Sequence, residues 1–363
     1  MRTADFDFEL PPELIAQMPA PERDQSRLLV LDRSSGKVAH RKFRDLLEYL
    51  RPGDVLVLNN SRVIPARLRG VNIQTGGQFE MLLLTENATN DWWVMLRPGK
   101  RARPGTQIAI RNLRGADSGV QATVVEKNEE GHRRLRFTGV SDIRNELDAL
   151  GEIPLPPYIE RGTRGTSESD RHRYQTVYAE PAGSVAAPTA GLHFTESLLN
   201  EIRTRGIRVC FITLHVGLGT FAPVKTESLA AHKMHEEYYE LSVETARTIT
   251  DAKRDGRRVL AVGTTTVRVL ESAFGGGPDS YILKGGHQTR GRTNIFIYPP
   301  FEFKIVDALL TNFHLPRSTL LMLISAFATP GETRGREMVL SVYKEAIRER
   351  YRFFSYGDAT LIL

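Results

Sequence analysis

Two histidines stand where short polar loops interrupt apolar segments. His193 follows the turn Pro188-Thr189-Ala190-Gly191, and His215 ends an apolar run; a second bare loop comes after it, formed by Gly217, Gly219 and Thr220. Glycine and hydroxyl loops let ligand groups approach backbone N–H groups closely. Imidazole exchanges protons near neutral pH. The two histidines together predict acid–base chemistry in one pocket, although either one alone could equally be a core histidine with satisfied hydrogen bonds.

Three further apolar segments end in polar residues. The segment 54–58 runs into a group that suits an anion or a base edge, namely Asn59, Ser61, Arg62 and Arg67. The segment 258–262 is followed by Gly263, Thr264 and Thr265, which open a helix and so resemble an anion site. The spacing of these residues matches neither the phosphate-loop nor the dinucleotide fingerprint. The segment 307–315 carries Asn312 and His314 near its end.

Alternating strand and helix patterns predict the scaffold that holds these residues. Buried strands are expected over 26–32, 54–58, 207–214, 258–262, 293–298 and 307–315, and helices over 43–50, 195–205, 244–256, 318–328 and 337–350. The N-terminal 6–17 should form a strand and a short helix, whereas 161–173 lacks apolar anchors and should be a mobile loop. These patterns predict an α/β main domain with a mostly parallel sheet.

Between residues 67 and 151 the pattern changes to short strands separated by Gly, Asn and Asp turns, which is typical of an antiparallel β-barrel. We therefore expect an inserted barrel domain over 67–151 and a discontinuous α/β domain over 1–66 and 152–363. Positive charge collects in the insertion, with ten basic and four acidic residues from 97 to 136. Lys100, Arg101 and Arg103 share one proline-flanked turn and are predicted to contact an RNA backbone. Arg133 and Arg134 are expected to lie on a solvated face.

Composition narrows the class of protein. The 363 residues carry a net charge of +6 and a single cysteine, which fits a reducing cytoplasmic setting. No apolar run approaches membrane-spanning length. One cysteine and no clustered ligand motif argue against a zinc site, despite the pair His232 and His235. A serine nucleophile elbow is also missing. The residues alone thus indicate an enzyme acting on an anionic or nucleic-acid substrate.

Long blocks spread over the chain resemble one family, the S-adenosylmethionine:tRNA ribosyltransferase-isomerases of queuosine biosynthesis. They include D-V-L-V-L-N-N-S-R-V-I-P-A-R-L, G-S-V-A-A-P-T-A-G-L-H-F, T-L-H-V-G-L-G-T-F, V-G-T-T-T-V-R-V-L-E-S and Y-R-F-F-S-Y-G-D-A-T-L-I-L, and the resemblance runs from Phe6 to Leu363. Thr266 replaces the family's usual serine and keeps a hydroxyl. Asn294 replaces the usual aspartate and removes a carboxylate.

The resemblance implies an α/β domain with an inserted barrel and a transfer reaction on tRNA. The substrate would be tRNA that carries 7-aminomethyl-7-deazaguanine at the wobble position. The ribosyl part of S-adenosylmethionine would move onto the aminomethyl nitrogen and rearrange to an epoxycyclopentanediol, releasing adenine and methionine. S-adenosylmethionine would be a consumed co-substrate, with no further cofactor and no metal. We expect a cytoplasmic monomer without membrane contact.

This reaction needs a base for the 5′-carbon proton and an acid for the departing adenine. The candidates for these roles are His193, His215 and His314. Candidate substrate-binding residues are Asn59, Ser61, Arg62, Arg67, Thr189, Gly191, Gly217, Gly219, Thr220, Thr264, Thr265, Arg268, Asn312 and Asp358. A non-catalytic RNA-binding factor and an S-adenosylmethionine methyltransferase are the alternatives. Release of free adenine would distinguish the transferase from both.

Overall fold

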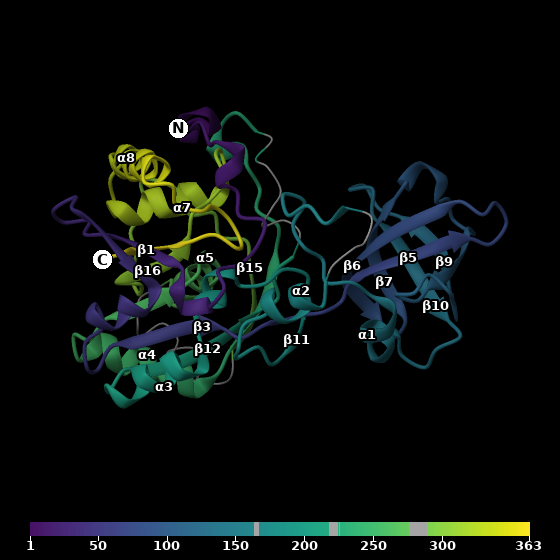
Figure 1. Cartoon of the computed structure of the whole chain (residues 1–363), viewed down its shortest axis with the longest axis horizontal. Helices are drawn as coiled ribbons and strands as arrows, with labels where there is room; N and C mark the ends of the chain where they lie inside the picture. Colours follow the sequence, from purple (N-terminus) through teal and green to yellow (C-terminus); the bar gives the residue numbers. More distant parts are fainter. Residues whose placement is uncertain (163–166, 218–223, 225, 276–288) are drawn as a thin grey trace.

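The computed structural model describes residues 1–162, 167–217, 224, 226–275 and 289–363. Figure 1 shows two lobes, a large one built on a mixed sheet and a smaller barrel set to one side. The sheet strands, in spatial order, are β15 (Thr289–Thr293), β13 (Glu237–Leu241), β12 (Arg208–Leu214), β3 (Val55–Asn59), β14 (Val259–Val262), β16 (Ala308–Asn312), β17 (Ala359–Ile362), β1 (Arg27–Leu31) and β2 (Val38–Lys42).

Helices cover both faces of this sheet, which explains the uninterrupted apolar runs of its central strands. Successive strand residues point to opposite faces, so Val55 and Val57 pack on one side and Leu56 and Leu58 on the other. One face is covered by α4 (Val243–Arg254), α5 (Thr264–Ala273), α7 (Thr319–Ala328) and α8 (Gly335–Arg348). The opposite face is covered by α3 (Glu196–Thr204) and the 3₁₀ helix η4 (Phe43–Glu48).

The α/β class with an inserted barrel is confirmed, but the sheet is mixed rather than mostly parallel. Strands β12, β3, β14 and β16 are mutually parallel, as is the pair β17 and β1. The other four pairings in the described sheet are antiparallel. Three of them involve β2, β13 and β15 at the two margins of the sheet, and the fourth lies inside it, where the C-terminal β17 runs against β16.

The smaller lobe is a closed barrel of antiparallel strands. Its strands are β5 (Arg67–Asn72), β6 (Gln78–Ala88), β7 (Asp91–Arg97), β8 (Gln107–Arg111), β9 (Asp117–Lys127) and β10 (Arg133–Thr138), in the closed order β10-β7-β6-β5-β8-β9. Alternate residues fill its own core. The chain enters and leaves at one point, because Arg67 N donates to Glu152 O at 3.1 Å and Glu152 N donates to Arg67 O at 2.9 Å. A Cβ on Gly151 would lie 1.9 Å from Pro65 O, so only glycine fits there.

Short elements complete the chain. They are η1 (Thr3–Phe6), η2 (Pro12–Leu14), η3 (Arg23–Gln25), β4 (Arg62–Val63), η5 (Gly99–Arg101), η6 (Ile143–Glu146), α1 (Leu147–Leu150), α2 (Glu168–Arg173), β11 (Ala182–Ser184), η8 (Thr189–His193) and η10 (Leu229–Ala231).

Three local predictions were wrong. No strand forms in 6–17, which holds short 3₁₀ turns. The expected strand 293–298 lies earlier, as β15, and only Thr293 is shared. Within 161–173, the part that the structure describes is anchored: Asp170 is buried, accepts two hydrogen bonds from Arg161 and caps α2 together with Ser167. This segment has no apolar residues to anchor it, and the ion pair between Arg161 and Asp170 holds it in place instead.

Candidate functional site at the carboxyl edge of the sheet

The parallel strands β12, β3, β14 and β16 bring most of the predicted residues to one edge. Their carboxyl ends point the same way and are followed by His215, Ser61, Thr264 and Asn312. Ligands of open α/β sheets bind outside such carboxyl ends. The edge, however, is divided into separate cavities, and the three candidate histidines line three different ones.

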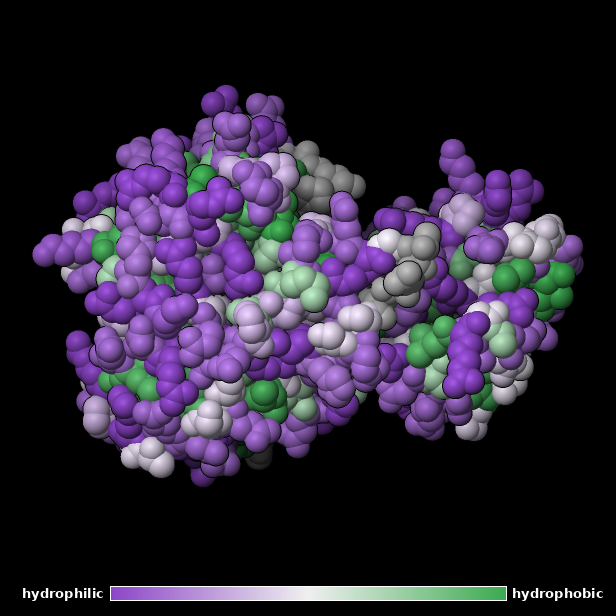
Figure 2. All heavy atoms as spheres, viewed as in Figure 1, coloured by the Kyte–Doolittle hydropathy of each residue, from purple (hydrophilic) through white to green (hydrophobic). Residues whose placement is uncertain are grey.

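His215 lies in a cleft between the two lobes. The cleft has a volume of about 540 Å³, and its walls come from the sheet edge, from β11 and from barrel residues such as Trp92 and Arg144. Figure 2 shows that the lobes meet at a narrow waist under a mostly hydrophilic surface. Gly217 lines the same cleft, which agrees with its selection as a substrate-binding candidate.

The His215 ring is held by contacts on two sides. Ser61 Oγ lies 2.7 Å from Nδ1 of the imidazole. Gly183 lies against the ring, so closely that a Cβ there would be 2.8 Å from its Cε1. The other ring nitrogen, Nε2, has no hydrogen-bond partner among the described residues. Burial lowers the pKa of His215 below its usual 6.5, with a smaller opposing effect of Glu240. The ring is therefore neutral at pH 7, and in the tautomer whose Nδ1 donates to Ser61 Oγ its Nε2 can accept a proton.

Asn59 holds together the strand ends that carry Ser61 and His215. Its amide joins the ends of β3 and β12, because Nδ2 donates to Leu214 O at 2.9 Å while Oδ1 accepts from the backbone N–H groups of Leu214 and Ser61. Both Asn59 and Ser61 are buried. Together they orient His215. The hydrogen bonds of their side chains are made to other parts of the protein.

A buried ion pair at the cleft was missed by the sequence reasoning. Glu237 on β13 lines the cleft and forms an ion pair with Arg268 of α5. Arg268 Nε also donates to Ile295 O at 3.3 Å, and its Nη2 is buried without a partner. A ligand carboxylate at Arg268, which is one of the candidate substrate-binding residues, would share this charge with Glu237. The strand residues Glu237-Tyr238-Tyr239-Glu240 carry no spacing that identifies the pair, because its partner lies 31 residues away.

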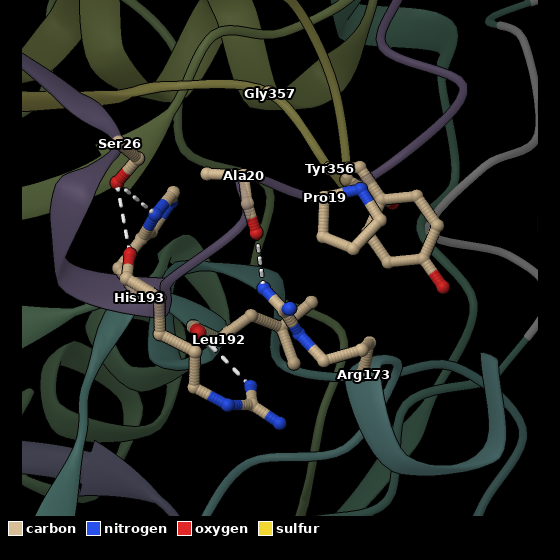
Figure 3. A pocket seen from close by; sticks show the side chains of 10 residues that line it. Pro19, Ala20, Ser26, Arg173, Leu192, His193, Tyr356 and Gly357 are labelled. Atoms are coloured by element: carbon tan, nitrogen blue, oxygen red, sulfur yellow. Dashed lines mark hydrogen bonds between the residues drawn. The ribbon is translucent and has the colours of Figure 1, made fainter. Parts of the chain in front are cut away.

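His193 is enclosed, and both of its ring nitrogens have hydrogen-bond partners. Figure 3 shows the contact with Ser26. Asn312 Nδ2 donates to Phe354 O at 3.1 Å, and its Nδ2 also lies 3.2 Å from His193 Nε2. Nε2 therefore accepts, and the proton sits on Nδ1, which lies 2.7 Å from Ser26 Oγ. Burial lowers the pKa of His193 to about 4. Its ring stacks on Phe43. These contacts describe a neutral core histidine.

A second large cavity, of about 460 Å³, lies beside β16. Asn312, His314 and Thr189 line it, together with aromatic residues such as Phe354. Asn312 Oδ1 is buried and has no hydrogen-bond partner. His314 Nε2 lies 3.0 Å from Thr311 Oγ1, and burial lowers the pKa of His314 to about 3. An apolar, aromatic cavity with an unused buried acceptor suits a nucleobase that carries an amine.

The other candidates lie as follows. Thr264 and Thr265 are buried in the first turn of α5. Gly191 packs under Tyr178, whose hydroxyl a Cβ would meet at 2.0 Å. Asp358 is buried and accepts from the backbone N–H groups of Arg27 and Arg352, so it shapes the turn before β17.

Two of the arginine candidates differ in exposure. Arg62 is exposed on β4. Arg67 is partly buried and donates to Leu155 O at 3.1 Å. Gly219 and Thr220 lie outside the described residues.

The barrel cations are exposed, and a buried arginine holds their turn. Lys100, Arg101 and Arg103 have no carboxylate partner in the part of the chain that is described. The expectation of a solvated face was wrong for Arg133, whereas Arg134 is partly exposed. Arg133 is buried and donates to the carbonyls of Gly99 and Ala102, which fastens the turn, and to that of Gly131. Arg134 is paired with Asp91 and Glu126.

Within the described ranges, no three His, Cys, Asp or Glu side chains gather as a metal site requires, and no helix is long and apolar enough to cross a membrane.

Comparison with known proteins gives consistent matches over the full length. The model of the family described as "Queuosine biosynthesis protein" matches residues 3–362. A protein of Clostridioides difficile strain 630 named S-adenosylmethionine:tRNA ribosyltransferase-isomerase is 50% identical, and one of the same name from Staphylococcus aureus strain JH9 is 48% identical, each covering 100% of both chains. The crystal structure of S-adenosylmethionine tRNA ribosyltransferase from Thermotoga maritima is 40% identical, with a TM-score of 0.53, and covers 99% of this chain and 100% of that one.

Proposed function

Because the chain belongs to the queuosine biosynthesis protein family, we propose that it is an S-adenosylmethionine:tRNA ribosyltransferase-isomerase. It moves the ribosyl part of S-adenosylmethionine onto the aminomethyl nitrogen of 7-aminomethyl-7-deazaguanine at the tRNA wobble position. The ribose rearranges to an epoxycyclopentanediol, and adenine and methionine are released. S-adenosylmethionine is consumed as co-substrate, and the protein acts as a cytoplasmic monomer.

One observation carries the assignment of the base: His215 lines the cleft between the lobes, and its Nε2 has no hydrogen-bond partner among the described residues. Its Nδ1 is fixed by Ser61, and burial keeps the ring neutral, so Nε2 can take the proton from the 5′-carbon that the sulfonium acidifies. A neutral base also fits a substrate amine that must itself be neutral to attack. His193 supports the site through Asn312 and is too enclosed to reach a substrate.

The cleft at His215 and the cavity beside β16 suit the two substrates. The cavity beside Asn312 and His314 has the size and aromatic lining for the adenosine part of S-adenosylmethionine. The cleft that holds His215 has a wall from each lobe, which allows an RNA nucleotide to enter from the barrel side. The exposed cations Lys100, Arg101 and Arg103 would contact the tRNA backbone. We retain 67–151 as the limits of the barrel domain.

A single incubation tests the proposed function. The purified protein is mixed with S-adenosylmethionine and tRNA that carries 7-aminomethyl-7-deazaguanine, and the small-molecule products are separated. Free adenine and methionine in equal amounts are expected. S-adenosylhomocysteine would instead identify a methyltransferase, and the absence of any product with tightly bound tRNA would identify a binding factor.

A further inference from the structure

The small cavity beside His193 carries two arginines, Arg23 and Arg173. Figure 3 shows Arg173 between His193 on one side of this cavity and Tyr356 on the other. Arg23 stands at the start of η3 and Arg173 at the end of α2, so segments far apart in sequence place both cations here. Neither has a carboxylate within ion-pair distance among the described residues.

Both guanidinium groups bind backbone carbonyls only. Arg23 donates to Leu192 O at 3.0 Å and to His172 O at 2.8 Å. Arg173 donates to the carbonyls of Ala20 and Pro21. Carbonyl oxygens satisfy hydrogen bonds but carry no net charge, so two positive charges remain.

Two further facts show that the charge is unbalanced. Arg173 Nε is buried and has no hydrogen-bond partner. The pKa of Arg23 is lowered, first by burial and then by the charge of Arg173, which places the two cations close enough to repel each other. Like charges in a partly buried site are unfavourable unless an anion joins them.

The neighbouring Arg161 does have a carboxylate partner, so the uncompensated charge is confined to Arg23 and Arg173. Arg161 is bound through two nitrogens by Asp170, whose Oδ1 also accepts from the Tyr356 hydroxyl at 3.0 Å. Asp170 is thus already occupied by Arg161, Tyr356 and Ser167. Nothing in this group neutralises Arg23 and Arg173.

We propose that the cavity between Arg23 and Arg173 is an oxyanion-binding site. Its volume of about 20 Å³ admits one water-sized group, so a single oxygen of a phosphate or carboxylate would enter while the remainder stays outside. The donors are Arg173 Nε–H and the guanidinium N–H groups of Arg23 and Arg173 that do not already bind carbonyls. Ser355 lines both this cavity and the larger one beside Asn312, so the anion would lie next to the substrate cavity.

Two substrates of the proposed reaction carry such an oxygen, the phosphodiester of tRNA and the methionine carboxylate of S-adenosylmethionine. This part of the inference rests on the proposed function. The binding of an oxyanion does not, because it can be measured without any reaction.

The first test uses inorganic phosphate and the full chain. Thermal unfolding is measured at rising phosphate and, separately, at rising chloride of equal ionic strength. A ligand that binds only the folded state raises the midpoint with concentration. The midpoint should rise with phosphate beyond the chloride series. Equal behaviour in the two salts would overturn the proposal.

Charge-removing variants locate the effect. In Arg23→Gln and Arg173→Gln the phosphate-dependent rise should disappear. Arg33→Gln is the matched control, because Arg33 is also partly buried and donates to two backbone carbonyls, those of Phe327 and Asp307. It should lower the midpoint and keep the full phosphate response. Retention of that response in all three variants would overturn the proposal.

If a glutamine variant fails to fold, Arg23→Lys and Arg173→Lys replace it. Lysine keeps the charge and loses the planar fork, so phosphate should still stabilise these proteins, but only at several-fold higher concentration. An undiminished response in both lysine variants would contradict a site built on the guanidinium groups.

Substrate measurements then identify the source of the anion. If a tRNA phosphate binds here, each glutamine variant lowers the slope of log affinity against log salt by about 0.7–0.9 and leaves the KM for S-adenosylmethionine unchanged. If the carboxylate binds here, that KM rises at least tenfold and the salt slope is unchanged. No change in either quantity would refute the link to the substrates.

Discussion

Ser61 and Gly183 hold the imidazole of His215 at the wall of the cleft. Asparagine at this position can still donate toward Ser61 but cannot accept a proton. We expect His215→Asn to lower single-turnover adenine release by a factor of about 100 or more, with tRNA affinity unchanged. His40→Asn, on β2, is the control and should turn over normally. Normal turnover in His215→Asn would remove it from the base role.

The pH dependence of turnover follows from the direction of the His215 shift. Burial lowers its pKa below 6.5, and the neutral ring is the active form. Single-turnover rates should therefore be level above pH 6.5 and fall at lower pH, with a midpoint below 6.5. A midpoint above 6.5 would show that another group limits the rate.

His193 should affect stability rather than turnover. Its folded pKa of about 4 lies below the unfolded value of 6.5, so below pH 6.5 the unfolded chain binds a proton that the folded chain does not. The free energy of unfolding therefore falls as pH drops from 6.5 toward 4. In His193→Gln this dependence should be shallower by about one proton, and unfolding at pH 7 should cost about 1–3 kcal/mol less. Denaturant titrations across pH 4–7, with adenine release per folded molecule, separate this role from catalysis.

At the scale of elements, β11 sets the position of the His215 ring. Gly183 has φ +156°, and a Cβ would meet the ring at 2.8 Å. Gly183→Ala should therefore displace the imidazole and lower turnover at least tenfold. Gly76→Ala, at φ +70° in a turn with open space around it, is the control. Like Gly183→Ala, it should lose about 1 kcal/mol of stability, but it should keep full activity.

The turn of η5 presents its cations as one rigid group, because Arg133 fastens it from below. Neutralising Lys100, Arg101 and Arg103 together should flatten the salt dependence of tRNA binding by about two to three units of slope. The same removal of charge at Lys37, Arg41 and Lys42, near and on β2, is the matched control. An equal change in both triple variants would assign the effect to net charge alone.

Over the whole molecule, elements with local signals could be predicted and contacts between distant residues could not. The strands ending at Asn59 and Asn312 were evident from apolar runs, and so was the barrel. The burial of Arg133 could not be foreseen, since its acceptors belong to a turn about 30 residues away. Likewise Asp170 and Arg161 form an anchor inside a segment that looks disordered by composition.

The separation of His193 from His215 could not be predicted for the same reason. His193 and His215 border one strand–helix unit in sequence, so a shared pocket was reasonable. They lie apart along the edge of the sheet, because His193 contacts Asn312 on β16 whereas His215 contacts Ser61 at the ends of β3 and β12. Which strand neighbours which depends on crossover connections that the sequence pattern does not specify.

Because the backbones of Arg67 and Glu152 are paired, the barrel is joined to the rest of the chain at a single point. Entry and exit exchange two hydrogen bonds, so the residues on either side of the insertion already sit next to each other. A short glycine linker from Ala66 to Glu152 would close the sheet lobe without stretching it. The barrel could therefore be removed or replaced without moving the two chain ends that flank it in the sheet lobe.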